Sequence, residues 1–177
     1  MHYARTVHGH YAEMITIAVP SRTEVFLKRT VQDILEKATG EIEVFPILDG
    51  YDLPPEEKVS DPRVHYIVWP VGRGKRYAMN EAIAQGHGEH VMSVDAHCMF
   101  AKGFDEVLTA DCEEDWVMVP RRQRLDAENW CLQKQVDKRP PIDYEYIQWP
   151  LKHNPVAFHG FKWDARTLER WDIPIDD

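Results

Sequence analysis

The residues best suited to chemistry are Asp95 and His97, two positions apart at the end of the apolar stretch VMSVDAHCMF (91–100). In a continuing strand both side chains would point to the same face, and in a turn after the strand both could reach one ion. Carboxylate plus imidazole suits a divalent cation such as manganese, with magnesium as the alternative, and leaves positions open for phosphate oxygens. A surface turn with an incidental histidine has the same pattern, so the prediction depends on the surrounding elements.

Basic residues gather in two short stretches, GRGKR (72–76) and PRRQR (120–124). The formal net charge of −9 makes nucleic acid an unlikely partner, because nonspecific binding to phosphates needs a net basic face. A small anion site is compatible with this charge, and either stretch could hold a phosphorylated ligand. The alternative for each is a solvated loop.

Strands and helices must alternate along the chain to position these groups. Short apolar runs rich in β-branched residues predict strands at 14–19, 41–48, 64–69, 89–94 and 116–120. Pro20 would end the first strand, since proline cannot donate to a ladder. Helices are predicted at 21–40, 77–86 and 103–112.

The first two helices carry the clearest local signals. Ser21 and Glu24 fit a capping box at the start of the first helix, and Gly40 would end it. In the second, Gly86 lies near the predicted end. The side chains expected to face inward from these helices are Leu27, Val31, Ile34, Leu35, Ala38, Ala78, Ala82 and Ile83.

This alternation predicts an α/β fold with a mostly parallel sheet flanked by helices. In such sheets ligands gather beyond the carboxyl ends of the strands. The polar residues expected at that edge are Pro20 to Arg22, Asp49, the loop 72–76, and Asp95 with His97.

The 177 residues are predicted to form a single domain, with a core at 14–120 and a long irregular C-terminal excursion at 121–177. That segment is rich in proline and aromatic residues and has no clear periodicity before DARTLERW (164–171). The tryptophans of the segment are expected to pack against the sheet and one another: Trp130, Trp149, Trp163 and Trp171.

Composition indicates a globular protein with no membrane partner, because no apolar run is long enough to cross a bilayer. The N-terminal stretch lacks the pattern of a secretory signal, so a cytoplasmic location is expected. Cys98, Cys112 and Cys131 are odd in number and irregularly spaced, which predicts reduced thiols.

Three stretches taken in order, ITIAVPSR, FPILDGYD and GRGKRYAMNEAIAQGHGEHVMSVDAHC, resemble the nucleotide-binding half of a GT-A glycosyltransferase of the family 2 kind. The resemblance covers roughly 14–120 and implies a Rossmann-like GT-A fold that binds a nucleotide sugar. That family typically shows Asp-x-Asp where this chain has Asp95-Ala96-His97. The variant, with Cys98 following, resembles the polypeptide N-acetylgalactosaminyltransferases.

The resemblance implies a base and ribose pocket for a UDP-sugar. Asp49 would bind the uracil edge, and Pro20, Ser21 and Arg22 would line the pocket, with Asp52 as a weaker candidate. The alternative for Asp49 is that it caps its own turn before Gly50.

The resemblance also implies a diphosphate site. Arg73 and Lys75 would face the donor near its diphosphate, and Asn80 would close the helix side. Asp95 and His97 would hold a metal that bridges the two phosphates and acts as a Lewis acid on the leaving UDP. The alternatives are plain surface charges for Arg73 and Lys75 and a solvent-facing side chain for Asn80.

The sequence departs from the family on the acceptor side, where we find no match to the expected acidic motif, so the catalytic residues are unassigned. One interpretation, which we favour, is the amino-terminal part of a longer enzyme. In the other, a compact variant completes the metal site with His153 or His159 and uses Asp176 or Asp177 on the acceptor side.

The leading functional prediction is a metal-dependent glycosyltransferase that moves a hexosyl or N-acetylhexosaminyl group from a UDP-sugar to an unknown acceptor. Tyr77 stands where the similar transferases have a basic residue, which leaves the donor sugar open. A UDP- and metal-binding module without transfer activity is the alternative. A sugar-nucleotide pyrophosphorylase is weaker, because VPSRTE (19–24) has no glycine after the first strand, and a ligand-free scaffold ranks last.

Overall fold

The computed structural model describes residues 14–110, 112–120, 122–133, 145–148 and 159–162. The chain divides into two compact units, 1–116 and 117–177, and each is described by itself. The domain boundaries expected from the sequence remain a prediction. Among the described residues, no helix has the length and apolar character needed to span a membrane.

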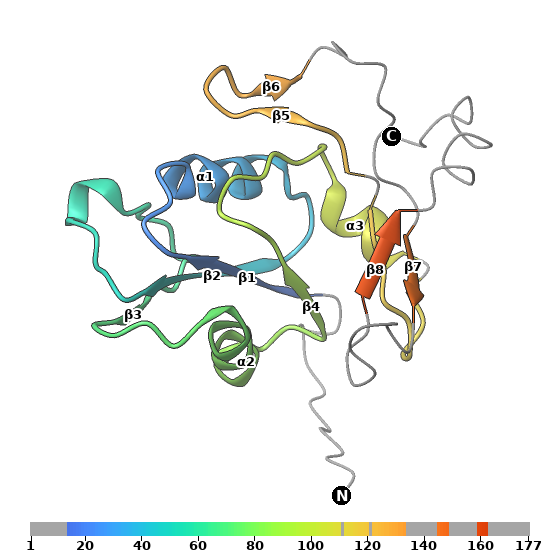
Figure 1. The fold of residues 1–177 in the computed structure, drawn as a ribbon, viewed down its shortest axis with the longest axis horizontal. Coiled ribbons are helices and arrows are strands. Elements are labelled where there is room, and N and C mark those ends of the chain that lie inside the picture. Colours follow the sequence, from blue (N-terminus) through green and yellow to red (C-terminus); the bar gives the residue numbers. More distant parts are fainter. Residues whose placement is uncertain (1–13, 111, 121, 134–144, 149–158, 163–177) are drawn as a thin grey trace, which may run out of the picture. The chain divides into compact units, whose positions relative to one another are not determined.

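The first unit is built on a parallel sheet of four strands (Figure 1). Its strand order is β3-β2-β1-β4, so β1 and β2 lie in the middle. The strands are β1 (Ile15–Ser21), β2 (Ile42–Asp49), β3 (Ile67–Trp69) and β4 (His90–Ser93). The predicted α/β class with a parallel sheet flanked by helices is confirmed.

Helices cover the two faces of this sheet (Figure 1). Ile17 and Val19 of β1 belong to the core cluster that includes Val31 of α1 (Leu27–Lys37). Ala18, which points to the other face, shares a second cluster with Ala78 of α2 (Lys75–Gln85). The alternation of β1 side chains thus assigns one helix to each face. The remaining helices are η1 (Pro55–Glu57) and α3 (Phe104–Thr109).

Prolines occupy both central strands without breaking them. Ala18 accepts a hydrogen bond from the backbone N–H of Val94, so Pro20, two residues on, faces the same side, beyond the end of β4. Val44 bonds to Arg63 and His65, so Pro46 also faces that neighbouring segment, between this bridge and the start of β3. Each missing N–H therefore falls where no ladder bond is made. The predicted strand ended at residue 19, two residues before the end of β1 at Ser21.

The predicted capping box is wrong. Ser21 is the last residue of β1, and α1 begins only at Leu27, with Phe26 as an N-cap that makes no side-chain cap bond. Thr23, at φ 61°, turns the chain between the two elements. The predicted apolar face of α1 is confirmed, although the helix ends at Lys37, before Gly40.

Two further predictions are wrong, the inward orientation of Ile83 and the strand at 116–120. Ile83 is exposed, because α2 meets the sheet through the small residues Ala78 and Ala82. No strand forms at 116–120, where three consecutive apolar residues after Trp116 are exposed and no neighbouring strand pairs with them. An apolar run becomes a strand only when a ladder satisfies its backbone groups.

The second unit contains more regular structure than the predicted irregular excursion. Two antiparallel pairs form, β5 (Leu125–Asp126) with β6 (Cys131–Leu132), and β7 (Glu145–Gln148) with β8 (His159–Lys162). Trp130 lies in the turn of the first pair, at φ 52°. Several predicted features lie outside the described residues: the helix at 164–171, Trp149, Trp163, Trp171, His153, Asp176 and Asp177.

Candidate functional site

The carboxylate of Asp49 holds the glycine-rich loop before α2. Asp49 ends β2, is only 6% exposed, and accepts hydrogen bonds from the backbone N–H groups of Arg73 (2.5 Å) and Gly74 (2.9 Å). The backbone N–H of Gly50 bonds to the carbonyl of Trp69 in β3, and the Asp49 carboxylate bonds to a loop more than 20 residues away rather than capping its own turn. A contact between Asp49 and uracil remains a prediction.

Two glycines let this loop approach the end of β2. Gly50 has a φ of 90°, and a Cβ there would lie 3.0 Å from the backbone nitrogen of Gly72. A Cβ on Gly72 would in turn lie 2.4 Å from Nη2 of Arg22, so the Arg22 guanidinium lies directly against Gly72. The turn after β1, the turn after β2 and the glycine-rich loop are therefore packed together.

Ser21 is tied to a residue that the sequence analysis missed. Its hydroxyl and that of Tyr51 are hydrogen-bonded, with the oxygens 2.5 Å apart. Burial raises the pKa of the Tyr51 hydroxyl, and the hydrogen bonds with Ser21 and the Thr23 backbone only partly offset this. Pro20 is half-buried beside them. Asp52, the weaker candidate, is exposed and pairs with Lys58 at 2.7 Å.

Asp95 and His97 lie just after β4 with their side chains directed outward. Val94 and Ala96 are buried while Asp95 and His97 are each about half exposed, which is the alternation of an extended chain. Oδ1 of Asp95 is 2.6 Å from Nζ of Lys75, the first residue of α2. The start of α2 and the chain after β4 thus meet at the carboxyl edge of the sheet.

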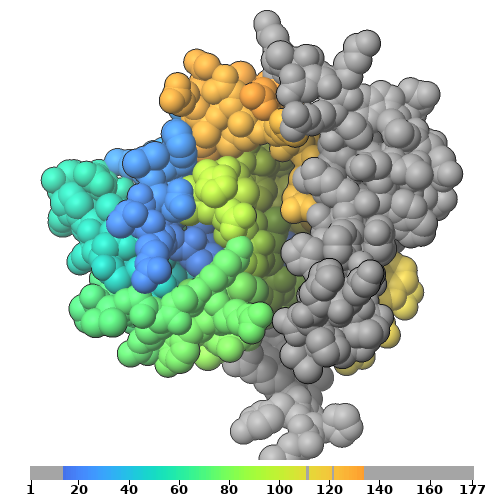
Figure 2. All heavy atoms as spheres, viewed as in Figure 1, coloured from blue at the N-terminus to red at the C-terminus, as the bar shows by residue number. Residues whose placement is uncertain are grey.

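His97 lies near the turn after β1. Its Nδ1 is 3.7 Å from Oε2 of Glu24, an acidic residue that sequence reasoning had assigned to a helix cap. In Figure 2 the blue atoms of the turn after β1, the green atoms of the glycine-rich loop with α2, and the yellow-green atoms after β4 appear on one face. The ion pairs and glycine contacts join these three segments.

Buried polar groups of α1 hold the chain after His97. The hydroxyl of Thr30 accepts the backbone N–H of Cys98 at 3.1 Å, and Oδ2 of Asp33 accepts that of Phe100 at 2.7 Å. Burial raises the pKa of the Cys98 thiol, so it stays protonated at neutral pH. The loop that carries Asp95 and His97 is therefore fixed by α1.

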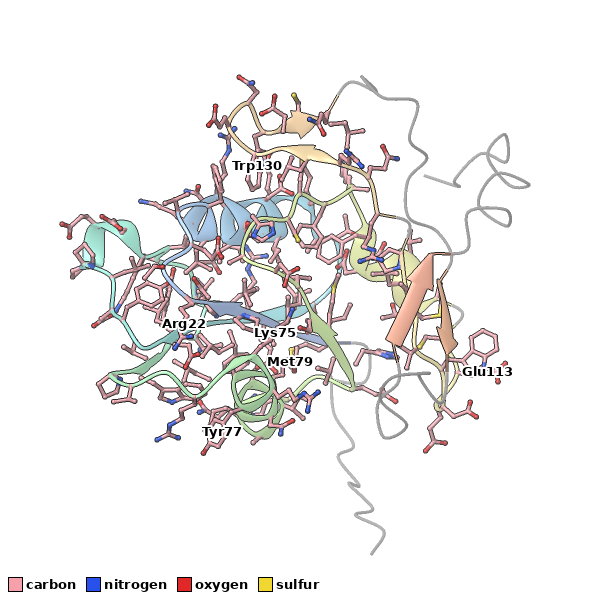
Figure 3. The ribbon with its side chains drawn as sticks, viewed as in Figure 1. Arg22, Lys75, Tyr77, Met79, Glu113 and Trp130 are labelled. Carbon is pink, nitrogen blue, oxygen red and sulfur yellow. The ribbon has the colours of Figure 1, made fainter. Side chains whose placement is uncertain are left out.

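Arg73 is directed toward aromatic rings. Its guanidinium carbon lies 5.1 Å from the ring centroid of Trp69 and 4.9 Å from that of Tyr77, and Nη1 donates to the Tyr77 hydroxyl at 3.0 Å. Figure 3 shows Tyr77 and Lys75 on opposite sides of α2. The structure thus brings Lys75 to Asp95 and the Arg73 guanidinium to the rings of Trp69 and Tyr77. Asn80 is exposed on α2.

A protein-family model matches most of the chain. It is the model of glycosyl transferase family 2, and it matches residues 16–167. The chain belongs to glycosyl transferase family 2. The protein is therefore a glycosyltransferase, whose family reaction implies a nucleotide-sugar donor and an acceptor. Its parallel sheet between α1 and α2 agrees with the GT-A fold. No curated protein matches the chain.

Asp95 and His97 carry the kinds of atom that an open metal site uses, and metal binding by them remains a prediction. Asp95 supplies carboxylate oxygens and His97 an imidazole nitrogen, both half exposed, which suits a cation that keeps positions for phosphate oxygens. Among the described residues, no group of three or more His, Cys, Asp or Glu side chains could enclose a cation. The side chain of His159 in β8 is outside the described residues.

Proposed function

We propose that the protein is a metal-dependent glycosyltransferase that transfers a hexosyl or N-acetylhexosaminyl group from a UDP-sugar to an acceptor. The observation that carries the proposal is the meeting of Lys75 with Asp95 at the carboxyl edge of the sheet. Ligands of α/β sheets bind at this edge. The Asp-x-His resemblance to polypeptide N-acetylgalactosaminyltransferases supports UDP as the nucleotide.

The anchored loops would bind the donor along its length. Ser21, Pro20 and Arg22 would line the base and ribose pocket, while Asp49 keeps the glycine-rich loop in place and accepts from the uracil edge. Arg22, whose guanidinium lies against Gly72, is positioned by that contact to reach the donor across the loop.

Asp95 and His97 would hold a divalent cation, with manganese preferred and magnesium as the alternative. When bound, the cation supplies Lewis-acid stabilisation of the negative charge that develops on the leaving diphosphate. The protein's own contribution is positional: Thr30 and Asp33 fix the loop behind the two ligands, and Asp49 fixes the loop opposite them. Such preorganised sites need little rearrangement during the reaction.

The test is a calorimetric titration of UDP with and without Mn²⁺, on the wild type and on His97→Ala. We expect binding that strengthens with Mn²⁺ in the wild type and loses that dependence in the variant. His65→Ala is the matched control, because His65 is an exposed histidine in the segment before β3 and should leave the titration unchanged. Absence of UDP binding under every metal condition would contradict the proposal.

A turnover assay separates the transferase from a binding module. The transferase should release UDP from a UDP-sugar in the presence of Mn²⁺, at least by slow transfer to water, and His97→Ala should abolish the metal-dependent part. Tight UDP binding with no release from any UDP-sugar would instead favour the binding module.

A further inference from the structure

We propose that Lys75 competes with the divalent cation for Asp95 and thereby sets the affinity of this site for metal. The inference rests on the proposed function, since it concerns the cation that Asp95 and His97 would hold. It starts from the ion pair itself: Nζ of Lys75 lies 2.6 Å from Oδ1 of Asp95, within the range of a charge-assisted hydrogen bond.

Hydrogen bonds to the rest of the first unit hold the backbone next to both Lys75 and Asp95 in place. Lys75 begins α2 directly after Arg73 and Gly74, whose backbone N–H groups are bonded to Asp49. Asp95 precedes the chain that Thr30 and Asp33 hold through the backbone of residues 98 and 100. The ammonium group is therefore kept within reach of Asp95 by the fold.

A cation bound to the same carboxylate oxygen must displace the ammonium group, since two positive charges at one oxygen repel each other. The displacement is sterically feasible because the Lys75 side chain is 57% exposed and has a flexible four-carbon stem. Once released, its three N–H donors are free to bind an anion such as the phosphates of the donor. Lys75 thus neutralises Asp95 before the metal arrives and lowers the metal affinity by competition.

The experiment titrates MnCl₂ alone into wild type, Lys75→Met and Arg76→Met, by calorimetry and by the electron paramagnetic resonance signal of free Mn²⁺. Arg76 is the next residue of α2 and is exposed, so its replacement makes the same change in net charge without removing the Asp95 partner. We expect Lys75→Met to bind Mn²⁺ about 3- to 5-fold more tightly, as expected when a weak surface ion pair no longer competes. Arg76→Met should stay within about twofold of wild type.

Equal or weaker Mn²⁺ binding by Lys75→Met would overturn the inference, and so would an equal gain in both variants, which would indicate a general charge effect. UDP titrations of the same three proteins keep this result separate from the proposed function. If UDP binds all three but Lys75→Met shows no gain in Mn²⁺ affinity, the competition is wrong while the donor site stands. If UDP binds none under any metal condition, the proposed function fails on its own measurement.

Discussion

The carboxylate of Asp49 and the backbone N–H of Gly74 are joined by a hydrogen bond of 2.9 Å, which links the end of β2 to the residue before α2. A second bond, from the N–H of Arg73, uses the other carboxylate oxygen. Asp49 therefore fixes the start of α2, and with it Lys75, relative to the sheet. The acidic end of the second strand thus fixes the position of the loop.

Asp49→Asn should weaken both the fold and donor binding. The amide can accept through one oxygen, but its NH₂ group would face the second backbone donor, which costs about 1–3 kcal/mol of unfolding free energy. Because the glycine-rich loop would then move, we expect UDP affinity to fall about tenfold. Urea unfolding and calorimetry measure the two effects.

Asp52→Asn is the matched control for that substitution. Asp52 is exposed and its partner is Lys58, so its replacement should leave UDP affinity and stability nearly unchanged. If Asp52→Asn reduced UDP affinity as much as Asp49→Asn, the weaker candidate would belong to the pocket and the special role of Asp49 would be lost.

The close approach of Gly50 to Gly72 predicts a difference between two alanine substitutions. Gly50 and Gly74 share nearly the same positive φ, 90° and 93°, but only Gly50 would place a Cβ against backbone atoms, and nothing lies within 4 Å at Gly74. Gly74→Ala should therefore cost about 1–2 kcal/mol from backbone strain alone. Gly50→Ala should lower the free energy of unfolding by about 1 kcal/mol or more beyond the effect of Gly74→Ala.

Unfolding midpoints in urea measure this difference, and retention of the native circular dichroism spectrum by both variants is the prerequisite. Equal destabilisation of the two variants would mean that the loop moves away from Gly50 at no cost. In that case the turn at Gly50 and the glycine-rich loop would not hold each other rigidly.

The packing of Arg73 on Trp69 and Tyr77 predicts that two arginines behave differently toward the donor. Arg73→Met should change UDP affinity by less than about threefold, because its guanidinium packs on the two aromatic rings. Arg22→Met should weaken UDP binding several-fold more, since its guanidinium lies against Gly72 in the glycine-rich loop that is proposed to face the donor. Calorimetry distinguishes them, and an effect of Arg73→Met as large as that of Arg22→Met would favour the predicted role of Arg73 at the diphosphate.

Local patterns in the sequence were sufficient to predict the sheet and its carboxyl edge. The β-branched runs indicated the strands, of which β1 and β2 are buried, and the strand ends located Asp49 and Asp95 at one edge. The capping box failed because Ser21 instead bonds to Tyr51, 30 residues away, and a local motif carries no information about such a contact. The run 116–120 failed as a strand because pairing depends on a neighbour that apolar content cannot supply.

The sequence analysis also did not predict which polar residues are buried. Thr30, Asp33, Glu43 and Asp105 each bond to backbone or side chains far along the chain, and nothing in their own neighbourhood marks them as interior. Their types are usually found at the surface. Only the fold supplies the donors that make their burial tolerable.

Glu43 provides a prediction about stability at the opposite end of the sheet from the proposed donor site. Its side chain in β2 is 7% exposed and accepts from the Thr16 hydroxyl at 2.6 Å and from the backbone N–H groups of His87 and Gly88. Glu43→Gln should lower the free energy of unfolding at neutral pH by about 2 kcal/mol, because one or more of these donors loses its acceptor. Glu41→Gln, on the exposed residue before β2, is the control and should have little effect.

The same carboxylate predicts how that difference changes with pH. Burial acts to raise the pKa of Glu43, but the hydrogen bonds from Thr16, His87 and Gly88 outweigh it and hold the pKa below its ordinary value of 4.5. A carboxyl group with a lowered pKa in the folded state contributes stability above the unfolded value and loses it as the pH falls through the folded value. The gap in unfolding free energy between wild type and Glu43→Gln should therefore be constant above about pH 6 and shrink below pH 4.5. A gap that stayed the same down to pH 3, in urea titrations of both proteins, would mean that the ionised carboxylate is not what these donors stabilise.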